Sequence, residues 1–135
     1  MGQLDWVELY FSSTGRLARG PFLLAVAILM ALWTLFEVLV EGHPTLRLLT
    51  GWAVYPLLIF TGACILSKRL HDRGHTGWLA AVLIVALIAI WPVPHTFFDF
   101  LFAVAIVWAA VELGVLPGEQ GANRYGPNPL KSATA

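Results

Sequence analysis

The sequence has few charged residues and one cysteine, and no segment before Pro21 resembles a secretory leader. The 135 residues include 8 Lys and Arg and 8 Asp and Glu, and the formal net charge is zero. This balance predicts no nucleic-acid partner, because proteins of that class need a basic surface. The one cysteine, Cys64, excludes an internal disulfide bond, and its place in an apolar run favours a buried, unreactive thiol. No basic and apolar leader precedes Pro21, so we expect no secretory signal there.

Apolar residues are abundant instead. They make up 59% of the sequence, and they gather in four long runs. A helix that spans a bilayer needs about 20 mainly apolar residues. We therefore predict an all-α integral membrane protein with four transmembrane helices, at residues 21–40, 46–66, 78–91 and 97–116.

The third run, 78–91, is shorter than the other three. It crosses the membrane if its helix stands nearly upright and Trp78 and Trp91 mark the two interfaces. A re-entrant hairpin or a buried interfacial helix is the alternative. The full crossing is favoured, because without it the basic residues near the C-terminus would fall on the opposite side from the others.

Several residues predict where the helices begin or bend. Pro21 is expected at the first helical position of the first span, and Thr45 is expected to cap the second. Pro56, near the middle of the second span, removes one backbone hydrogen bond and is expected to kink that helix. Thr96 and Asp99 have the spacing of a capping box before the fourth span.

The basic residues are sorted by side in this topology. Arg47 alone falls on one side, and the other seven fall on the side of both termini: Arg16, Arg19, Lys68, Arg69, Arg73, Arg124 and Lys131. Short loops rich in Lys and Arg stay in the cytoplasm during membrane insertion. We therefore expect both termini to be cytoplasmic.

The chain then divides into an N-terminal cytoplasmic segment, a transmembrane domain and a cytoplasmic tail, at residues 1–19, 20–117 and 118–135. Leu4, Val7 and Phe11 share one face of a helix, which predicts a short interfacial helix in the first segment. After Arg124 the tail is rich in proline and small residues, and we expect it to end without structure.

Three motifs meet on the side of the termini. They read G-R-L-A-R-G at 15–20, R-L-H-D-R-G-H-T-G-W at 69–78 and G-A-N-R-Y-G-P-N-P at 121–129. The combination F-x-x-x-G-R-x-x-R, R-L-H-D-x-G-x-[ST]-G-W and N-R-Y-G-P-x-P resembles the DUF805 family of bacterial inner-membrane proteins of unknown function. The resemblance runs from about Tyr10 to Pro129. It implies a small multi-spanning protein of the bacterial inner membrane and supplies no catalytic residues.

These motifs have a structural and a functional interpretation. In the structural one, Gly74 and Gly77 allow tight turns, Thr76 caps the third helix and Asp72 pairs with Arg16, Arg19 or Arg73. In the functional one, several guanidinium groups bind a phosphate, a lipid headgroup or another anion. The candidate site residues are Arg16, Arg19, Arg69, His71, Asp72, Arg73, Arg124 and Tyr125.

Metal binding and catalysis are disfavoured. His71, Asp72 and His75 could supply ligands to a metal, but the cations interleaved with them oppose a divalent ion. We therefore expect neither a metal nor a cofactor. Ser67 is the nearest hydroxyl to the histidines, and no G-x-S-x-G nucleophile elbow is present, so we expect no enzyme.

Two acids inside the spans, Glu37 and Glu112, each have a local explanation. Glu37 can pair with Arg47, and Glu112 can meet the basic cluster. We therefore favour a non-enzymatic binding or scaffold module that contacts membrane lipids, an anion or a membrane-protein partner, with a homo-oligomer as a further arrangement. The competing class is a small transporter or channel subunit, in which these acids would line a wet cavity.

Overall fold

A computed structural model describes residues 5–90 and 95–132, and this part of the chain is helical with no β-strand. The elements in chain order are α1 (Trp6–Phe11), α2 (Arg19–Val40), α3 (Pro44–Asp72), α4 (Trp78–Ala89), α5 (Phe97–Ala110), the π-helical turn η1 (Val111–Val115) and α6 (Pro129–Ser132). The all-α prediction is confirmed.

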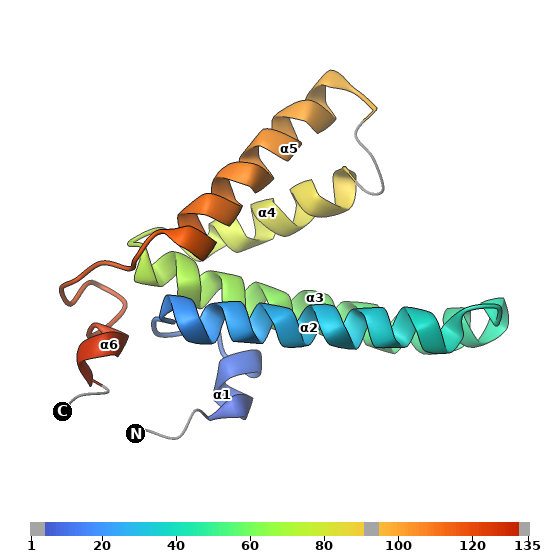
Figure 1. Cartoon of the computed structure of the whole chain (residues 1–135), viewed down its shortest axis with the longest axis horizontal. Coiled ribbons are helices and arrows are strands. Elements are labelled where there is room, and N and C mark those ends of the chain that lie inside the picture. The colour runs from blue at the N-terminus through green and yellow to red at the C-terminus, as the bar shows by residue number, and fades with distance from the viewer. Residues whose placement is uncertain (1–4, 91–94, 133–135) are drawn as a thin grey trace.

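The long helices form two hairpins, α2 with α3 and α4 with α5 (Figure 1). The hairpins meet where α3 passes into α4, and they diverge away from that junction. The described ends of the chain both lie near the junction, with α1 packed against α3. We call this the junction end and the turn between α2 and α3 the hairpin end.

Three helical stretches are long and apolar enough to cross a membrane: Arg19–Val40, Pro44–Asp72 and Phe97–Val115. Only 11% of the most apolar part of the first and of the third is buried inside the protein. Such continuous apolar surface needs lipid around it. The chain is therefore a helical membrane protein.

The fourth predicted span is only partly realised. Helix α4 has 12 residues, which at 1.5 Å each give about 18 Å, against about 30 Å for the hydrocarbon core of a bilayer. Trp91, expected at the far interface, lies outside the described residues. The described structure thus gives three helices of spanning length and a shorter apolar one.

The hydrophobic core lies at the junction end. Its buried members include Leu17, Phe22, Ile65, Leu83 and Leu113, which come from all four long helical segments and the loop before α2. Cys64 is buried beside them, as predicted. Large apolar side chains elsewhere on the hairpins are mostly exposed. In the described part of the chain the core cluster therefore lies at the junction end, and its packing surrounds the candidate site.

Helix starts differ from the sequence predictions in three places. Helix α2 begins at Arg19, so Pro21 is its third residue, where the backbone N–H is still outside the helical hydrogen-bond ladder. Helix α3 is capped by His43 instead of Thr45, because Pro44 takes the first position. Helix α4 is capped by Gly77 without a side-chain hydrogen bond from Thr76.

Two other features agree with the sequence. The capping box is present: the side chain of Thr96 accepts from the backbone of Asp99, and the side chain of Asp99 accepts from the backbone of Thr96. The short N-terminal helix is also present as α1, although Leu9 is its buried residue while Val7 and Phe11 are exposed. Leu4 lies outside the described residues.

Helix α3 is longer than its apolar run. It continues through Pro56 and ends at Asp72, six residues past the predicted end at position 66. The residues from Lys68 to Asp72 are therefore helical and not part of a loop. His71 and His75 consequently do not share a helical face, because His75 follows the end of the helix.

Candidate functional site

Three segments meet around the last turn of α3 at the junction end. They are residues 13–19 before α2, residues 68–77, and residues 112–126 after α5. The backbone N–H of Leu17 donates to the carbonyl of Lys68 at 3.2 Å, and the N–H of Glu119 donates to the carbonyl of Asp72 at 2.8 Å. The polar end of α3 is thus held between the two other segments.

Arg69 is at the centre of this arrangement, and its side chain is 0% exposed. Its Nε donates to the carbonyl of Leu113 at 2.7 Å, and its Nη2 to the carbonyl of Leu116 at 2.6 Å. Its Nη1 donates to Asp72 and, at 3.4 Å, to the carbonyl of Leu17. One guanidinium therefore joins α3 to both neighbouring segments.

Asp72 lies between two arginines. Its Oδ1 accepts from Nε of Arg16 at 3.0 Å, and its Oδ2 accepts from Arg69. The side chains of Arg16 and Asp72 are 1% and 3% exposed. Of the three partners predicted for Asp72, Arg16 is confirmed, while Arg19 and Arg73 bind elsewhere. Asp72 is the shared counter-charge of two buried cations.

Arg16 also binds the segment that follows α5. Its Nη1 donates to the carbonyl of Gly121 at 2.6 Å and to that of Gly126 at 3.4 Å, and its Nη2 donates to that of Glu119 at 2.6 Å. A planar guanidinium has five N–H donors in a fixed fork, which suits several acceptors at once. Arg16 therefore fixes the course of the chain after α5.

A second acid, Glu112, lies in the π-helical turn η1. Its Oε1 accepts from Nε and Nη2 of Arg73 at 3.0 and 2.7 Å, and Nε2 of His75 lies 3.3 Å away. Nη1 of Arg73 donates to the carbonyl of Pro117. The prediction that Glu112 meets the basic cluster is confirmed.

The segment after Arg124 is not without structure, contrary to the prediction. Asn123 and Gly126 exchange backbone hydrogen bonds, and α6 follows. The Tyr125 ring stacks on His71 at 3.8 Å between ring centres, and His71 also contacts the carbonyl of Gly15 through Nδ1 at 3.1 Å. The contacts to α3 and to the first motif order this part of the tail.

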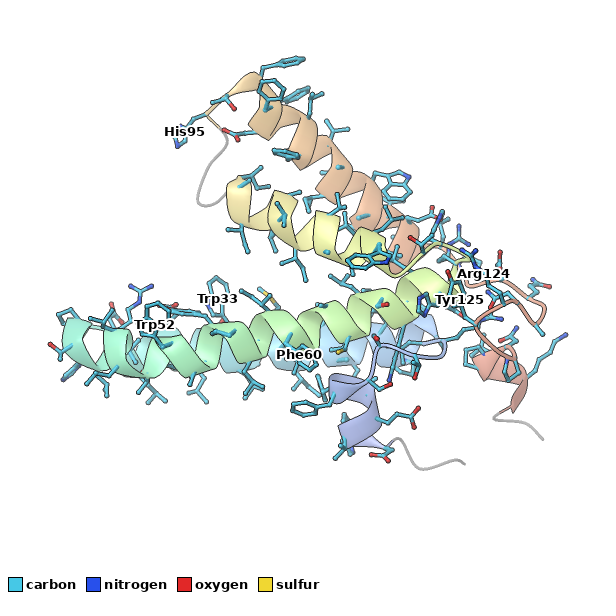
Figure 2. All side chains as sticks on the ribbon, turned by 180° about the vertical axis from the view of Figure 1, so that it is seen from behind. Trp33, Trp52, Phe60, His95, Arg124 and Tyr125 are labelled. Carbon is cyan, nitrogen blue, oxygen red and sulfur yellow. The ribbon has the colours of Figure 1, made fainter. Side chains whose placement is uncertain are left out.

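Arg124 occupies the rim of the site. Its guanidinium lies 4.8 Å from the centre of the Tyr125 ring, and its side chain is exposed at the surface (Figure 2). Arg19 is also exposed, and its Nη1 donates to the carbonyl of Val115 at 2.8 Å. The predicted site residues are thus brought to one end of the molecule, six inside or against the network and these two at its edge.

Sequence reasoning missed two members of the network. Lys68 is buried and donates to the carbonyl of Glu8 in α1. Glu119 accepts from Nδ2 of Asn123 at 2.7 Å, and the same Nδ2 donates to the carbonyl of His71 at 2.9 Å. The long polar extension of α3 could have indicated Lys68, whereas nothing in the sequence around Glu119 marks it.

The network is closed. Across residues 5–90 and 95–132, no buried side-chain nitrogen or oxygen lacks a hydrogen-bond partner. The same ranges contain no group of three or more His, Cys, Asp and Glu residues that could hold a metal ion. The arrangement can therefore hold segments together, and the groups it leaves for a ligand lie at its rim.

Glycines make room for the network. A Cβ on Gly118 would overlap the carboxylate of Asp72, and a Cβ on Gly77 would overlap the hydroxyl of Ser67. Gly77 has an ordinary φ of −62°, so space and not turn geometry requires it. Gly74 does adopt a positive φ of 74°, as the turn prediction requires.

Replacing Gly118 with Ala is expected to lower the free energy of unfolding by about 1–3 kcal/mol, because the added methyl displaces the Asp72 carboxylate. Thermal unfolding in detergent would measure this loss. The control is Gly121→Ala, since a Cβ there meets no atom within 4 Å. Equal midpoints for the two variants would contradict the packing described for Gly118.

A separate polar group lies at the hairpin end. Nη2 of Arg47 is 3.0 Å from Oε2 of Glu37, and the Tyr55 hydroxyl donates to Oε1 of Glu37 at 2.7 Å. Nε of Arg47 donates to the Tyr55 hydroxyl at 3.2 Å. The predicted pairing of Glu37 with Arg47 is confirmed, with Tyr55 as an additional member.

Together these features define a class: a small helical membrane protein whose helical hairpins are joined at one end by a closed network of ion pairs and backbone contacts. All three sequence motifs contribute to that network. The chain belongs to the family described as "Protein of unknown function (DUF805)", which matches residues 10–127. The resemblance inferred from the motifs is confirmed.

Two relatives are similar to most of the chain. "Uncharacterized protein YiiR" of Escherichia coli (strain K12) is 30% identical over 125 residues, covering 86% of this chain and 84% of that protein. The protein of the same name from Escherichia coli O157:H7 has the same identity and coverage. No solved structure matches this chain.

Proposed function

We propose that this protein is a non-enzymatic membrane protein that binds anionic lipid headgroups through the exposed arginines at the rim of the network. The observation that carries this proposal is a division among the predicted site arginines. Arg16, Arg69 and Arg73 donate to carboxylates and backbone carbonyls inside the protein. Arg19 and Arg124 are exposed. The first group supports the site, and the second contacts the ligand.

The charge count of the network supports this division. Three carboxylates, those of Asp72, Glu112 and Glu119, accompany the three inner arginines. Their charges balance those of the three arginines, and Lys68, the remaining cation of the network, lies near the carboxylates of Glu8 and Asp5, so the network itself has little attraction for an additional anion. The rim arginines add positive charge that no acid of the network neutralises. A basic rim of this kind suits a leaflet rich in anionic lipids.

We also propose which end of the protein faces the cytoplasm and which membrane holds the protein. Seven of the eight basic residues belong to the junction end, which by the positive-inside rule is the cytoplasmic end, and the membrane is the bacterial inner membrane. The described chain ends lie on the same side of the molecule, which favours an even number of crossings (Figure 1). Helix α4 would make the fourth crossing.

The contacts of the two membrane acids favour binding over transport. A transporter or channel subunit would direct Glu37 or Glu112 into a water-filled cavity. Glu112 accepts from Arg73, and Glu37, although it lines a hollow at the hairpin end, accepts from Tyr55 and pairs with Arg47, so both carboxylates are already paired within the protein. The Ser67 hydroxyl, the candidate nucleophile considered in the sequence, is buried and donates to the carbonyl of Ser13, which supports a non-enzymatic role.

Native mass spectrometry of the full chain tests this proposal. With phosphatidylglycerol and phosphatidylcholine of identical acyl chains in competition, Arg19→Gln with Arg124→Gln is expected to lower the preference for phosphatidylglycerol. The reduction should be about fivefold for each residue, because a basic group near an anionic surface contributes ~1 kcal/mol.

The matched control is Arg19→Lys with Arg124→Lys, which keeps the charge and should keep most of the preference. Thermal unfolding of both double variants checks that the fold is intact. An unchanged preference in the glutamine variant would refute lipid binding at the rim.

A further inference from the structure

The hairpin end carries two adjoining hollows that the proposed function does not use. One, of about 450 Å³, is lined by Glu37, Glu41, His43 and Arg47 among others. The second, of about 500 Å³, is lined by Arg47, Leu48, Trp52 and Pro56 among others. Pro44 and Arg47 line both hollows, so the two are continuous along the start of α3.

The first hollow presents one cation and one anion that are open to a ligand. Arg47 is 56% exposed, and its Nη2 and Nε contact Glu37 and Tyr55, while its Nη1 has no partner among residues 5–90 and 95–132. The carboxylate of Glu41 likewise has no hydrogen-bond partner in those ranges, and the residue is exposed. A ligand that carries both a negative and a positive charge complements both groups.

The start of α3 adds to the attraction for a phosphate. His43 caps this 29-residue helix without a side-chain hydrogen bond, and Pro44 has no N–H. The N–H groups in the first turn of a helix have no acceptor within the helix and point out of its N-terminal end, where they attract anions. These groups lie beside Arg47, which reinforces a position for the negative part of the ligand.

The second hollow is apolar and suits an acyl chain. Leu48, Trp52 and Pro56 provide its side chains, and Trp52 lies toward the hairpin end of the molecule (Figure 2). Gly51 forms part of its wall, and the Tyr55 ring lies so close over it that a Cβ would come within 2.9 Å of ring carbon Cε2. This approach places the Tyr55 hydroxyl between Glu37 and Arg47. Tyr and Trp are enriched at membrane interfaces, where phospholipid headgroups lie.

We infer that these hollows bind one phospholipid whose zwitterionic headgroup has a primary ammonium, of the phosphatidylethanolamine class. The phosphate contacts Nη1 of Arg47 at the start of α3, the ammonium donates to Glu41, and one acyl chain lies along Leu48 and Trp52. A quaternary ammonium has no N–H to donate to Glu41. An anionic headgroup offers no cation to the carboxylates of Glu37 and Glu41. The site differs from the proposed rim site in place and in charge preference.

The experiment is native mass spectrometry of the full chain in mild detergent with equimolar phosphatidylethanolamine, phosphatidylcholine and phosphatidylglycerol of identical acyl chains. The variant Arg19→Gln with Arg124→Gln serves as the background, so that the rim does not contribute. We expect phosphatidylethanolamine to be retained about tenfold over phosphatidylcholine, the difference that one charge-assisted hydrogen bond makes. Glu41→Gln should abolish this preference, and Arg47→Gln should lower the retention of all three lipids.

Fluorescence quenching by lipids with brominated acyl chains locates the site. Brominated phosphatidylethanolamine should quench the protein more than brominated phosphatidylcholine, and Trp52→Phe should remove that difference. Trp78→Phe is the matched control, because Trp78 is 84% exposed and lies at the start of α4 near the junction. The inference would be overturned if the three lipids were retained equally or if phosphatidylglycerol were preferred. It would also be overturned by an unchanged preference in Glu41→Gln, or by a lipid-free dimer that buries Trp52. Failure of the rim proposal would leave these outcomes unaffected.

Discussion

Replacing Asp72 with Asn is expected to lower the free energy of unfolding by about 3–5 kcal/mol, the range for removing one partner of a buried ion pair. The change keeps the shape of the side chain and removes its charge. Arg16 and Arg69 would then remain buried beside each other without their shared carboxylate. Denaturation in detergent, followed by circular dichroism, measures the loss.

A suitable control for the Asp72 variant is Glu41→Gln, which removes a negative charge from an exposed residue that makes no ion pair among the described residues. It should change the stability by less than about 0.5 kcal/mol, as is usual for surface substitutions. If Asp72→Asn were as stable as Glu41→Gln, Asp72 would not be the counter-charge of the two arginines.

Arg69→Leu is expected to destabilise the protein by about 3 kcal/mol or more. The buried carbonyl of Leu113 and the partly buried carbonyl of Leu116 lose their side-chain donor. A buried acceptor left without a partner costs about 1–3 kcal/mol, and the packing of the Arg69 side chain at the centre of the network is lost as well. Asp72 keeps Arg16, so the loss comes mainly from the contacts with the segment after α5. Hydrogen exchange should show faster exchange of the amides in residues 113–126.

Arg47→Leu is the matched control for this variant, because Arg47 is 56% exposed and pairs with Glu37 at the hairpin end, far along α3 from Arg69. Its loss of stability should be smaller than that of Arg69→Leu, and exchange in residues 113–126 should not change. Unchanged exchange in residues 113–126 of Arg69→Leu would show that Arg69 does not hold this segment.

The helical spans could be predicted because lipid requires every backbone group to be paired within its own helix. The apolar runs therefore indicated the helices, although the run at 78–91 gives only a 12-residue helix, Trp78–Ala89, and several helix ends were misplaced. Helix α3 is the clearest case. Its final residues, from Ser67 to Asp72, are charged or polar except Leu70, so the span was predicted to end at residue 66. Packing against α1 and η1 allows these residues to continue the helix.

The candidate site could be predicted as a cluster but not as a network. Topology places the three motifs on one side, and the charge of Asp72 indicates that it binds an arginine. Most acceptors of Arg16 and Arg69 are backbone carbonyls, which every residue has, so no residue type marks them in the sequence. Gly118 could not be predicted either, because its role depends on the Asp72 carboxylate, which comes from a distant part of the chain.

The acceptors of Arg69 also determine when the protein can finish folding during its synthesis. Leu17 precedes Arg69 in the chain, but Leu113 and Leu116 are made more than 40 residues later. The α2–α3 hairpin therefore enters the membrane while the charged end of α3 still contacts water. Only when the segment with Leu113 and Leu116 has left the ribosome can that end become buried, so the joint between the hairpins forms later than the α2–α3 hairpin itself.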